Sequence, residues 1–424
     1  MATTGRRLRG PGGGHRPPRP PPWRAAAARA RAGARARAGR WLAALTGLAV
    51  LAGPAAAGCS AERSPGPAAA VSPKLASPKL AWSALCAAQP TPSLRAALDK
   101  TVARSRSGEV IPLGLSADGQ TAYVSTWAPG FSGVAALNLA SGGIRKIQSY
   151  ANPGADQADG ASGGRWLVWE ETVSLENLDN FTVYAWDSAT GRLHTIGHSL
   201  DGPGRVPWPS PWHPPAVSGD YAAWAQGYGP GGEVEIRLAD LATGQVRVIR
   251  QGHTQPPFFD GNLVVWPESD RPGTQTTLHA FSLATDRPAG LPVVLRGVHG
   301  TEFVVTDGVR TAYFSPDLTT LYYSPAPARP GRAVLRLPAN ESFADLAIGP
   351  GTLAWTTTVA TYLASTRIGS YVQVTPEYGD ATGSGSGVLI SDAATDKVAH
   401  PILPMHVISP ASVTWPACPP GIQS

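Results

Sequence analysis

Two histidines lie at the spacing of a zinc-binding pair. His194 and His198 are four residues apart, a spacing that would let both imidazoles share a metal ion if they lay on a helix. The surrounding residues, Arg-Leu-His-Thr-Ile-Gly-His-Ser, instead have the pattern of an outer β-strand and its exit. Four residues along a strand span about 13 Å, which is too far for one ion. The sequence therefore predicts no metal site and no cofactor.

Several carboxylates are grouped in the segment that begins at Trp169. Paired carboxylates serve as acid and base in glycosidases and as ligands for hard cations. The simpler interpretation is a solvated loop between two strands. The sequence has no Cys-x-x-Cys pair, no Gly-x-Ser-x-Gly motif and no phosphate loop, and the glycine-rich stretch 381–388 is predicted to be a flexible loop. We therefore predict no catalytic residues. The grouped carboxylates are Glu170, Glu171, Glu176 and Asp179.

Three connecting segments, 201–217, 251–261 and 296–303, are rich in aromatic residues, histidine and proline. Side chains of this kind form a binding face when the packing of the loops does not require them. The alternative is that they only pack and stiffen the loops. The predicted binding residues are Arg205, Trp208, Trp212, His213, His253, Phe258, Phe259, His299 and Glu302.

The elements that would position these loops repeat along the chain. A glycine followed by a short apolar stretch that ends on an aromatic residue recurs about every 49 residues, close to the ~40–50 residues of one propeller blade. Each copy continues with a second strand, a polar turn such as Asp-Leu-Ala-Thr-Gly, and a third strand. The recurring aromatic residues are Tyr123, Trp169, Trp224, Trp266, Tyr313, Trp355 and Trp415.

The repeated strands are apolar on both faces, as in Trp-Leu-Val-Trp at 166–169 and Leu-Val-Val-Trp at 263–266. Strands of this kind are covered on both sides, as each small sheet of a propeller is covered by its neighbours. The sequence predicts an all-β propeller with seven blades, or six as the alternative, in which the recurring aromatic rings are packing residues. The three connecting segments would then line the mouth of the central channel.

The seventh unit is incomplete at the C-terminus. The segment 79–86 could supply its missing strand, so that the two chain ends would complete one sheet. This pairing would bring Cys86 close to Cys418, and we expect a disulfide between them, with two unpaired cysteines as the alternative. Residues 93–105 are predicted to form a short structural helix with Ser93 as its N-cap.

A family resemblance supports the same fold. The segment 115–125, Leu-Ser-Ala-Asp-Gly-Gln-Thr-Ala-Tyr-Val-Ser, resembles the Ser-Pro-Asp-Gly-x-x-apolar-Tyr signature of the WD40-like repeat in TolB-related bacterial proteins, with Ala117 at the usual proline. The segment 314–324 is similar but lacks the glycine. The resemblance implies a propeller from about residue 109 to the end, with protein-binding or scaffold roles. It carries no catalytic residues to transfer.

The N-terminus predicts export. Residues 1–58 combine an Arg-rich region, an apolar run and small residues, as a secretory signal peptide does. Ala56-Ala-Gly-Cys59 resembles the lipobox of bacterial lipoproteins, in which the cysteine is acylated, although Ala56 stands where leucine is usual. We expect a lipid on Cys59, with cleavage by the ordinary signal peptidase and simple secretion as the alternative. Residues 59–81 would form an extended Ser/Pro/Ala-rich tether, and residues 82–424 the propeller domain.

The net charge of +6 comes from this N-terminal segment. Residues 1–58 contain eleven arginines and no acidic residue, so the rest of the chain has 24 basic and 29 acidic residues and a net charge of −5. A mildly acidic domain does not suit phosphate backbones, which excludes nucleic acid as a partner. The sequence predicts a binding or scaffold module for a protein or glycan of the cell envelope, at the outer face of the membrane. The alternative is an extracellular carbohydrate-active enzyme, a glycosidase or lyase, on a propeller scaffold.

Overall fold

The computed structural model describes most of the chain after residue 84. The described residues are 85–99 and 110–418, apart from 129, 152–156, 173–178, 212, 230, 272–273, 302, 377–378, 393–404 and 409–412. The predicted signal peptide at 1–58 and the predicted tether at 59–81 lie outside these residues. Within the described part, no helix combines the length and the apolar character that a membrane crossing requires.

Antiparallel sheets built from consecutive strands make up the described chain. The first sheet contains β2 (Val110–Leu115), β3 (Thr121–Ala128), β4 (Phe131–Asn138) and β5 (Ile144–Ser149). The second contains β6 (Gln157–Gly163), β7 (Trp166–Thr172), β8 (Phe181–Asp187) and β9 (Leu193–His198). The third begins with β10 (Ala216–Ser218), β11 (Tyr221–Gly227), β12 (Val234–Asp240) and β13 (Gln245–Thr254).

This third sheet is larger because the next unit is hydrogen-bonded to it. The added strands are β14 (Phe258–Asp260), β15 (Leu263–Ser269), β16 (Thr277–Ser282) and β17 (Arg287–Ala289). Among the described residues, strand pairing between the two units is confined to the ends of β13 and β15, where His253 pairs with Ser269 and Thr254 with Glu268. The eight strands therefore consist of two consecutive four-stranded units.

Three further sheets complete the fold. The fourth contains β18 (Val304–Thr306), β19 (Thr311–Phe314), β20 (Thr320–Ser324) and β21 (Arg332–Arg336). The fifth contains β22 (Phe343–Gly349), β23 (Thr352–Thr357), β24 (Thr361–Ser365), β25 (Ser370–Thr375) and the short β1 (Cys86–Ala87). The sixth contains β26 (Gly379–Ser384), β27 (Gly387–Asp392) and β28 (Met405–Ile408).

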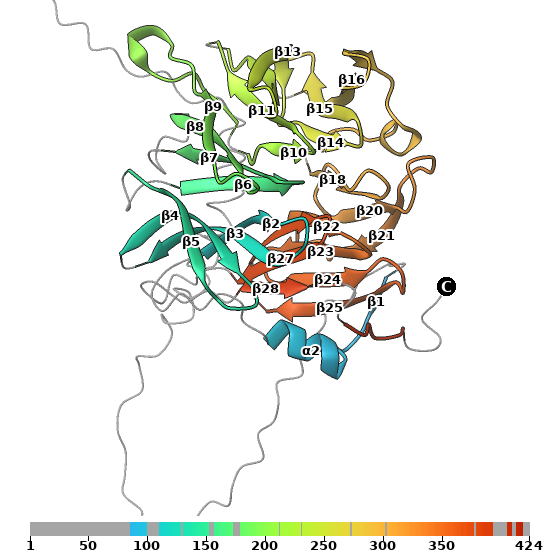
Figure 1. Cartoon of the computed structure of the whole chain (residues 1–424). Helices are drawn as coiled ribbons and strands as arrows, with labels where there is room; N and C mark the ends of the chain where they lie inside the picture. Colours follow the sequence, from blue (N-terminus) through green and yellow to red (C-terminus); the bar gives the residue numbers. More distant parts are fainter. Residues whose placement is uncertain are drawn as a thin grey trace, which may run out of the picture. The chain divides into compact units, whose positions relative to one another are not determined.

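The sheets follow one another around a common centre, toward which the first strand of each unit lies (Figure 1). Each first strand contacts the first strand of the next unit, and the series closes because β26 contacts β2. The order of these contacts is β2, β6, β10, β14, β18, β22, β26 and β2 again. This arrangement is a β-propeller, as the sequence predicted.

The recurring aromatic residues hold equivalent places in the fold. Six of them lie in the second strand of a four-stranded unit: Tyr123, Trp169, Trp224, Trp266, Tyr313 and Trp355. Trp169 and Trp355 are fully buried and Trp224 is 1% exposed, in clusters formed by neighbouring strands and sheets. Their burial supports the predicted packing role.

Three of these rings are also paired with an aromatic ring of the neighbouring strand. Trp169 lies opposite Tyr184 and Trp355 opposite Tyr362, with ring centroids 5.4 and 5.6 Å apart. The corresponding ring pair in the fourth sheet is Tyr313 with Tyr322, at 5.0 Å. Directly opposite aromatic residues stabilise neighbouring strands beyond the area that they bury.

The prediction for Trp415 was wrong. Residues 413–418 form no strand, and Trp415 is only partly buried against the fifth and sixth sheets. The second strand of the sixth sheet is β27, whose central residues Val388, Leu389 and Ile390 are fully buried. Aliphatic side chains therefore fill the place of the expected ring.

The recurring glycines make the turns between first and second strands. Gly164, Gly219 and Gly261 have φ angles of 59°, 56° and 57°, which only glycine adopts without strain. The repeat predicted from the sequence therefore started at the second strand of each unit instead of at the first. Three of the first strands, β10, β14 and β18, have three residues each, too few to show a periodic pattern.

The prediction that the glycine-rich stretch 381–388 forms a flexible loop was also wrong. It spans the turn between β26 and β27, which form a regular antiparallel hairpin. A Cβ atom on Gly383 would lie 1.9 Å from the carbonyl oxygen of Ile348 in β22. Glycine is thus required there for the close approach of two first strands.

The closure differs from the prediction. The N-terminal strand β1 does not join β26–β28; it pairs in parallel with β25, the outermost strand of the preceding sheet. The sixth sheet therefore has three strands among the described residues, all from the C-terminal part of the chain. The two chain ends are linked by a covalent bond rather than by a shared sheet.

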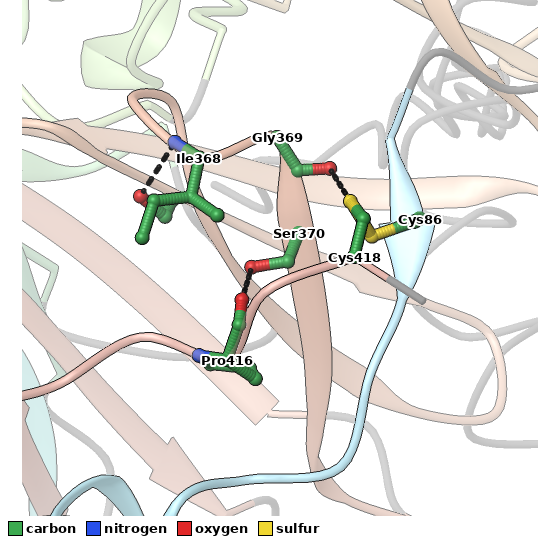
Figure 2. Close-up of a disulfide and its surroundings, with 7 residues drawn as sticks. Cys86, Ile368, Gly369, Ser370, Pro416 and Cys418 are labelled. Atoms are coloured by element: carbon green, nitrogen blue, oxygen red, sulfur yellow. Dashed lines mark hydrogen bonds between the residues drawn. A yellow bond between two sulfur atoms is a disulfide. The ribbon is translucent and has the colours of Figure 1, made fainter. Parts of the chain in front are cut away.

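The disulfide joins Cys86 to Cys418, with Cα atoms 5.7 Å apart (Figure 2). It fixes the C-terminal segment 413–418 against β25, where the Ser370 hydroxyl donates to the Pro416 carbonyl oxygen at 2.7 Å. The same segment contacts the start of the helix, since the Thr414 N–H donates to the Ser93 hydroxyl at 3.0 Å.

The predicted helix is present as α2 (Pro92–Asp99); residues 100–109 lie outside the described part. Its N-terminal cap is Thr91 rather than Ser93, because the Thr91 hydroxyl accepts the Leu94 N–H at 3.2 Å. Leu94 and Leu98 are buried against the fifth and sixth sheets, so the helix is a structural element.

Candidate functional site

The connections between consecutive units gather at one end of the sheets. In an antiparallel unit the chain leaves the second and the fourth strand at the same end. We call the connections 199–215, 255–257 and 290–303 the loop face. They contain, or directly adjoin, the residues predicted to bind a ligand.

The first connection is held by its own contacts. Ser210 is buried: its N–H donates to Asp179 Oδ1 at 2.9 Å, and its hydroxyl accepts the Gly227 N–H at 2.8 Å. The Trp208 ring is half-buried against Gly202, where an added Cβ would lie 3.0 Å from the ring. Trp208 therefore packs the loop, as the alternative interpretation proposed.

The other predicted residues of this connection have different environments. Arg205 is exposed, with a φ angle of 60°. His213 is half-buried, and its Nδ1 lies 3.1 Å from the Pro214 carbonyl oxygen. Trp212 lies outside the described residues.

The predicted residues of the other two connections do not converge. Phe259 is buried and Phe258 half-buried in separate clusters between sheets, so both serve packing. His253 lies in β13, and its buried Nδ1 has no hydrogen-bond partner among the residues that the structure describes. His299 is exposed and forms an isolated bridge with Thr277, while Glu302 lies outside the described residues.

A pocket of about 240 Å³ opens between these two connections. It takes residues from both of them, from the strand entry before β16 and from the turn between β19 and β20. Its lining residues are Gln255, Thr276, Gly300, Thr301, Phe303, Pro316 and Leu318. None of the seven predicted residues that the structure describes lines it, although four lining residues lie within the predicted segments.

The turn that closes the pocket is the segment resembling the propeller signature. The Ser315 hydroxyl bonds the Asp317 carboxylate and accepts the Thr320 N–H at 2.9 Å. The same hydrogen bonds occur at Ser116 and Asp118 in the first sheet. The signature thus identified a turn correctly, but here the turn lies between β19 and β20 and contributes to the pocket.

Leu318 is in a strained conformation. Its φ angle is 56°, in the left-handed region that Gly119 occupies in the equivalent turn at 68°. A non-glycine residue in this region costs about 1–3 kcal/mol, and such strain concentrates at functional sites. Its side chain lines the pocket and also packs on the core of the fourth and fifth sheets. This packing explains why an apolar side chain, and not glycine, stands at this position.

The carboxylates predicted to lie in a solvated loop are buried, so that prediction was wrong. Glu170 is 1% exposed, and Glu171 and Asp179 are each 7% exposed. Desolvation raises the pKa of Glu170 well above its usual value. Glu171 accepts a hydrogen bond from the Gln148 amide at 3.0 Å. Glu176 lies outside the described residues.

Three other carboxylates lie near the loop end of the first strands: Asp159 in β6, Asp345 in β22 and Asp380 in β26. Asp345 accepts the Ala381 N–H at 2.9 Å. Desolvation raises the pKa of Asp345 to about 7, and the negative charges of Asp380 and Asp159 act in the same direction. Sequence reasoning missed this group because it did not recognise the first strands.

The pKa of Asp345 predicts a dependence of stability on pH. An unfolded aspartate titrates near 3.9, so between pH ~4 and ~7 the folded state binds more protons than the unfolded state. The free energy of unfolding therefore falls as pH rises through this window. Asp345→Asn has no charge to desolvate, but its amide can accept only one of the two N–H groups that Asp345 accepts, those of Leu346 and Ala381. We therefore expect the stability difference between the variant and the wild type to shift in favour of the variant by about 1–3 kcal/mol between pH 4 and pH 7.5.

Urea unfolding at pH 4, 6 and 7.5 measures this difference. Asp307→Asn is the control, because Asp307 is a carboxylate on a turn outside the group. A constant difference between Asp345→Asn and the wild type at all three pH values would contradict the raised pKa.

The histidine pair is separated, as the strand pattern predicted. His194 and His198 both lie in β9, the outermost strand of the second sheet, and both are exposed. Across the residues that the structure describes, no group of three His, Cys, Asp or Glu side chains is arranged to hold a metal ion.

These features define a β-propeller with a pocket in its loop face, and the described residues that line this pocket carry no charge. No known protein-family model matches the chain. No curated protein matches it in sequence.

Solved structures resemble the fold at low identity. A prolyl endopeptidase is 15% identical, with a TM-score of 0.48 over 76% of this chain, and this chain spans half its length. An oligogalacturonate lyase from Vibrio parahaemolyticus is 12% identical, with a TM-score of 0.49 over 74% of this chain and 94% of the lyase. TolB from Acinetobacter baumannii is 14% identical, with a TM-score of 0.36 over 74% of this chain and 66% of TolB. Likenesses of this strength identify no activity for the present chain.

Proposed function

We propose that this protein is an exported, seven-bladed propeller, held at the outer face of the cell membrane by a lipid on Cys59, whose loop face binds a protein or a glycan of the cell envelope. The observation that carries the binding role is the pocket in the loop face. A solvent-accessible concavity lined by a few polar and apolar groups is the usual form of a ligand site.

The blade count follows from treating the two units of the eight-stranded sheet as separate blades. They share only the pairing between the ends of β13 and β15, whereas strands within each unit pair along their length. With this division, the ring of first strands that closes between β26 and β2 has seven members.

Cross-linking tests the binding role. A photoreactive phenylalanine analogue is placed at His299, which is exposed beside the pocket, in the full chain produced in a bacterium that processes lipoproteins. We expect a cross-linked species of higher mass after illumination. The control is the same residue at Gln245, which is exposed at the opposite end of β13. Equal yields from both positions, or none from His299, would overturn the role.

The Cys59→Ala variant tests the anchor. Removing the acylated thiol should move the protein from the membrane fraction to the soluble exported fraction, because one lipid-modified residue supplies the attachment. Intact mass of the membrane-extracted wild type should show the added acyl chains. A wild-type protein that is already soluble and has an unmodified N-terminus would contradict the lipid anchor and favour simple secretion.

A carbohydrate-active enzyme is the second candidate, and the carboxylates of the first strands favour it. Glycosidases use two carboxyl groups held in different protonation states. Asp345, with a pKa raised to about 7, and Asp380 could fill these roles. Release of reducing ends from envelope glycans by the wild type, abolished in Asp345→Asn, would favour the enzyme over the binding module.

A further inference from the structure

The chemistry of the pocket restricts its ligand more narrowly than the proposed binding role, on which this inference rests. The volume of about 240 Å³ exceeds the ~150 Å³ that accommodates benzene. It is smaller than the ~300–1,000 Å³ of sites for drug-sized molecules. The pocket therefore suits a single six-membered ring with substituents.

Three lining residues offer neutral hydrogen-bonding groups. Thr301 is 4% exposed, and its hydroxyl oxygen accepts the Phe303 N–H at 3.2 Å, which leaves its proton available to a ligand. The Gln255 amide and the Thr276 hydroxyl make no hydrogen bond within the described part of the chain. Their backbone groups are already used, in bonds with Pro267 and Gly300 at 2.8 and 3.1 Å.

The other side chains of the lining are apolar. Phe303 supplies an aromatic ring, which is held by Phe314 with ring centroids 5.6 Å apart. Pro316 and Leu318 come from the turn between β19 and β20. Gly300 lies next to Pro316 and has a φ angle of 67°, so the backbone approaches the pocket without a side chain.

This composition excludes two kinds of ligand. No described residue that lines the pocket is charged, so a carboxylate or phosphate would lose hydration without gaining a counter-ion. A purely aliphatic group would leave the proton of the buried Thr301 hydroxyl without an acceptor, at a cost of about 1–3 kcal/mol. The described lining therefore favours a neutral ligand that has hydroxyl or amide groups as well as an apolar face.

We propose that the pocket binds one uncharged sugar residue of a glycan. A pyranose ring has C–H groups on its faces, which pack on the Phe303 ring, and hydroxyl groups around its edge, which reach Gln255, Thr276 and Thr301. A pyranose is also a single six-membered ring, the size of ligand that suits the volume of the pocket.

Saturation-transfer NMR on the purified full chain tests this assignment. Two of the probes are neutral trisaccharides, triacetylchitotriose and mannotriose. The third probe is the charged trisaccharide trigalacturonate, and the fourth is an uncharged hexapeptide of Ala, Ser, Leu and Pro. We expect at least one neutral trisaccharide to bind, with saturation strongest on one ring. Gln255→Ala should raise its Kd about tenfold and Thr276→Val about threefold, since each loses one neutral hydrogen bond.

Gln245→Ala, remote from the pocket, should leave the Kd unchanged. The assignment is overturned if neither neutral sugar binds, if trigalacturonate binds as well as they do, or if Gln255→Ala leaves the Kd unchanged. Binding of the hexapeptide with the same sensitivity to Gln255 would replace the sugar by a protein partner. If His299 cross-links to a partner but no sugar binds, this inference alone is overturned. If a sugar binds but His299 gives no cross-link, only the proposed envelope partner is overturned.

Discussion

The Trp355→Ala variant is expected to lose about 3–5 kcal/mol of unfolding free energy. Trp355 is fully buried in β23, and its ring contacts Tyr362 and Tyr371, with centroids 5.6 Å from each. Because Trp355 and Tyr362 lie directly opposite each other in paired strands, the backbone cannot move inward to fill the space that alanine leaves. Equilibrium unfolding in urea, followed by circular dichroism, measures the loss.

Two comparisons separate packing from other effects. Trp355→Phe should cost less, about 1–2 kcal/mol, because the buried indole N–H has no hydrogen-bond partner in the described part of the chain, so no such bond is lost. Trp208→Ala, at a half-buried ring of the loop face, should cost under about 1 kcal/mol. If alanine at 355 and at 208 cost the same, the recurring aromatics would not be the packing residues of the fold.

Removing the disulfide by Cys418→Ser should cost about 3–5 kcal/mol. The bond closes a loop of 332 residues, so its loss greatly increases the freedom of the unfolded chain. The native state also loses the restraint on 413–418, whose contacts with Ser370 and Ser93 would become easier to break. We expect lower urea midpoints and faster proteolysis of the C-terminal segment.

The double variant Cys86→Ser/Cys418→Ser is the control. It should match Cys418→Ser within about 0.5 kcal/mol, because each change removes the same bond, and reductant should lower the stability of the wild type alone. A double variant that is much less stable than the single one would indicate that the Cys86 side chain, 4% exposed, matters through packing rather than through the bond.

The sequence predicted the fold through its longest and most regular signals. The turns after the third strands are an example: Asn138, Asp187 and Asp240 each accept N–H groups of the following residues, and each turn closes on a glycine with positive φ. Turns of this kind depend on local side-chain chemistry, so they can be predicted without knowledge of the tertiary structure. Three of the first strands, β10, β14 and β18, were not predictable in this way, because they have only three residues each.

The candidate site was predictable only in its location. The segments rich in aromatic residues and proline overlap the connections of the loop face, and within them Phe258, Phe259 and Trp208 are used for packing. The pocket is lined instead by residues such as Gln255 and Thr276, which no motif distinguishes from surface residues. These residues line a pocket only because two units of the fold place them side by side.

The parallel pairing of β1 with β25 determines where the start of the fold is attached (Figure 1). Since β25 is the outermost of its unit's consecutive strands, β1 lies at the circumference of the propeller. Anything fused ahead of residue 85 is therefore joined at the rim. A copy immobilised on a sensor surface through that end would keep its loop face open to macromolecules in solution.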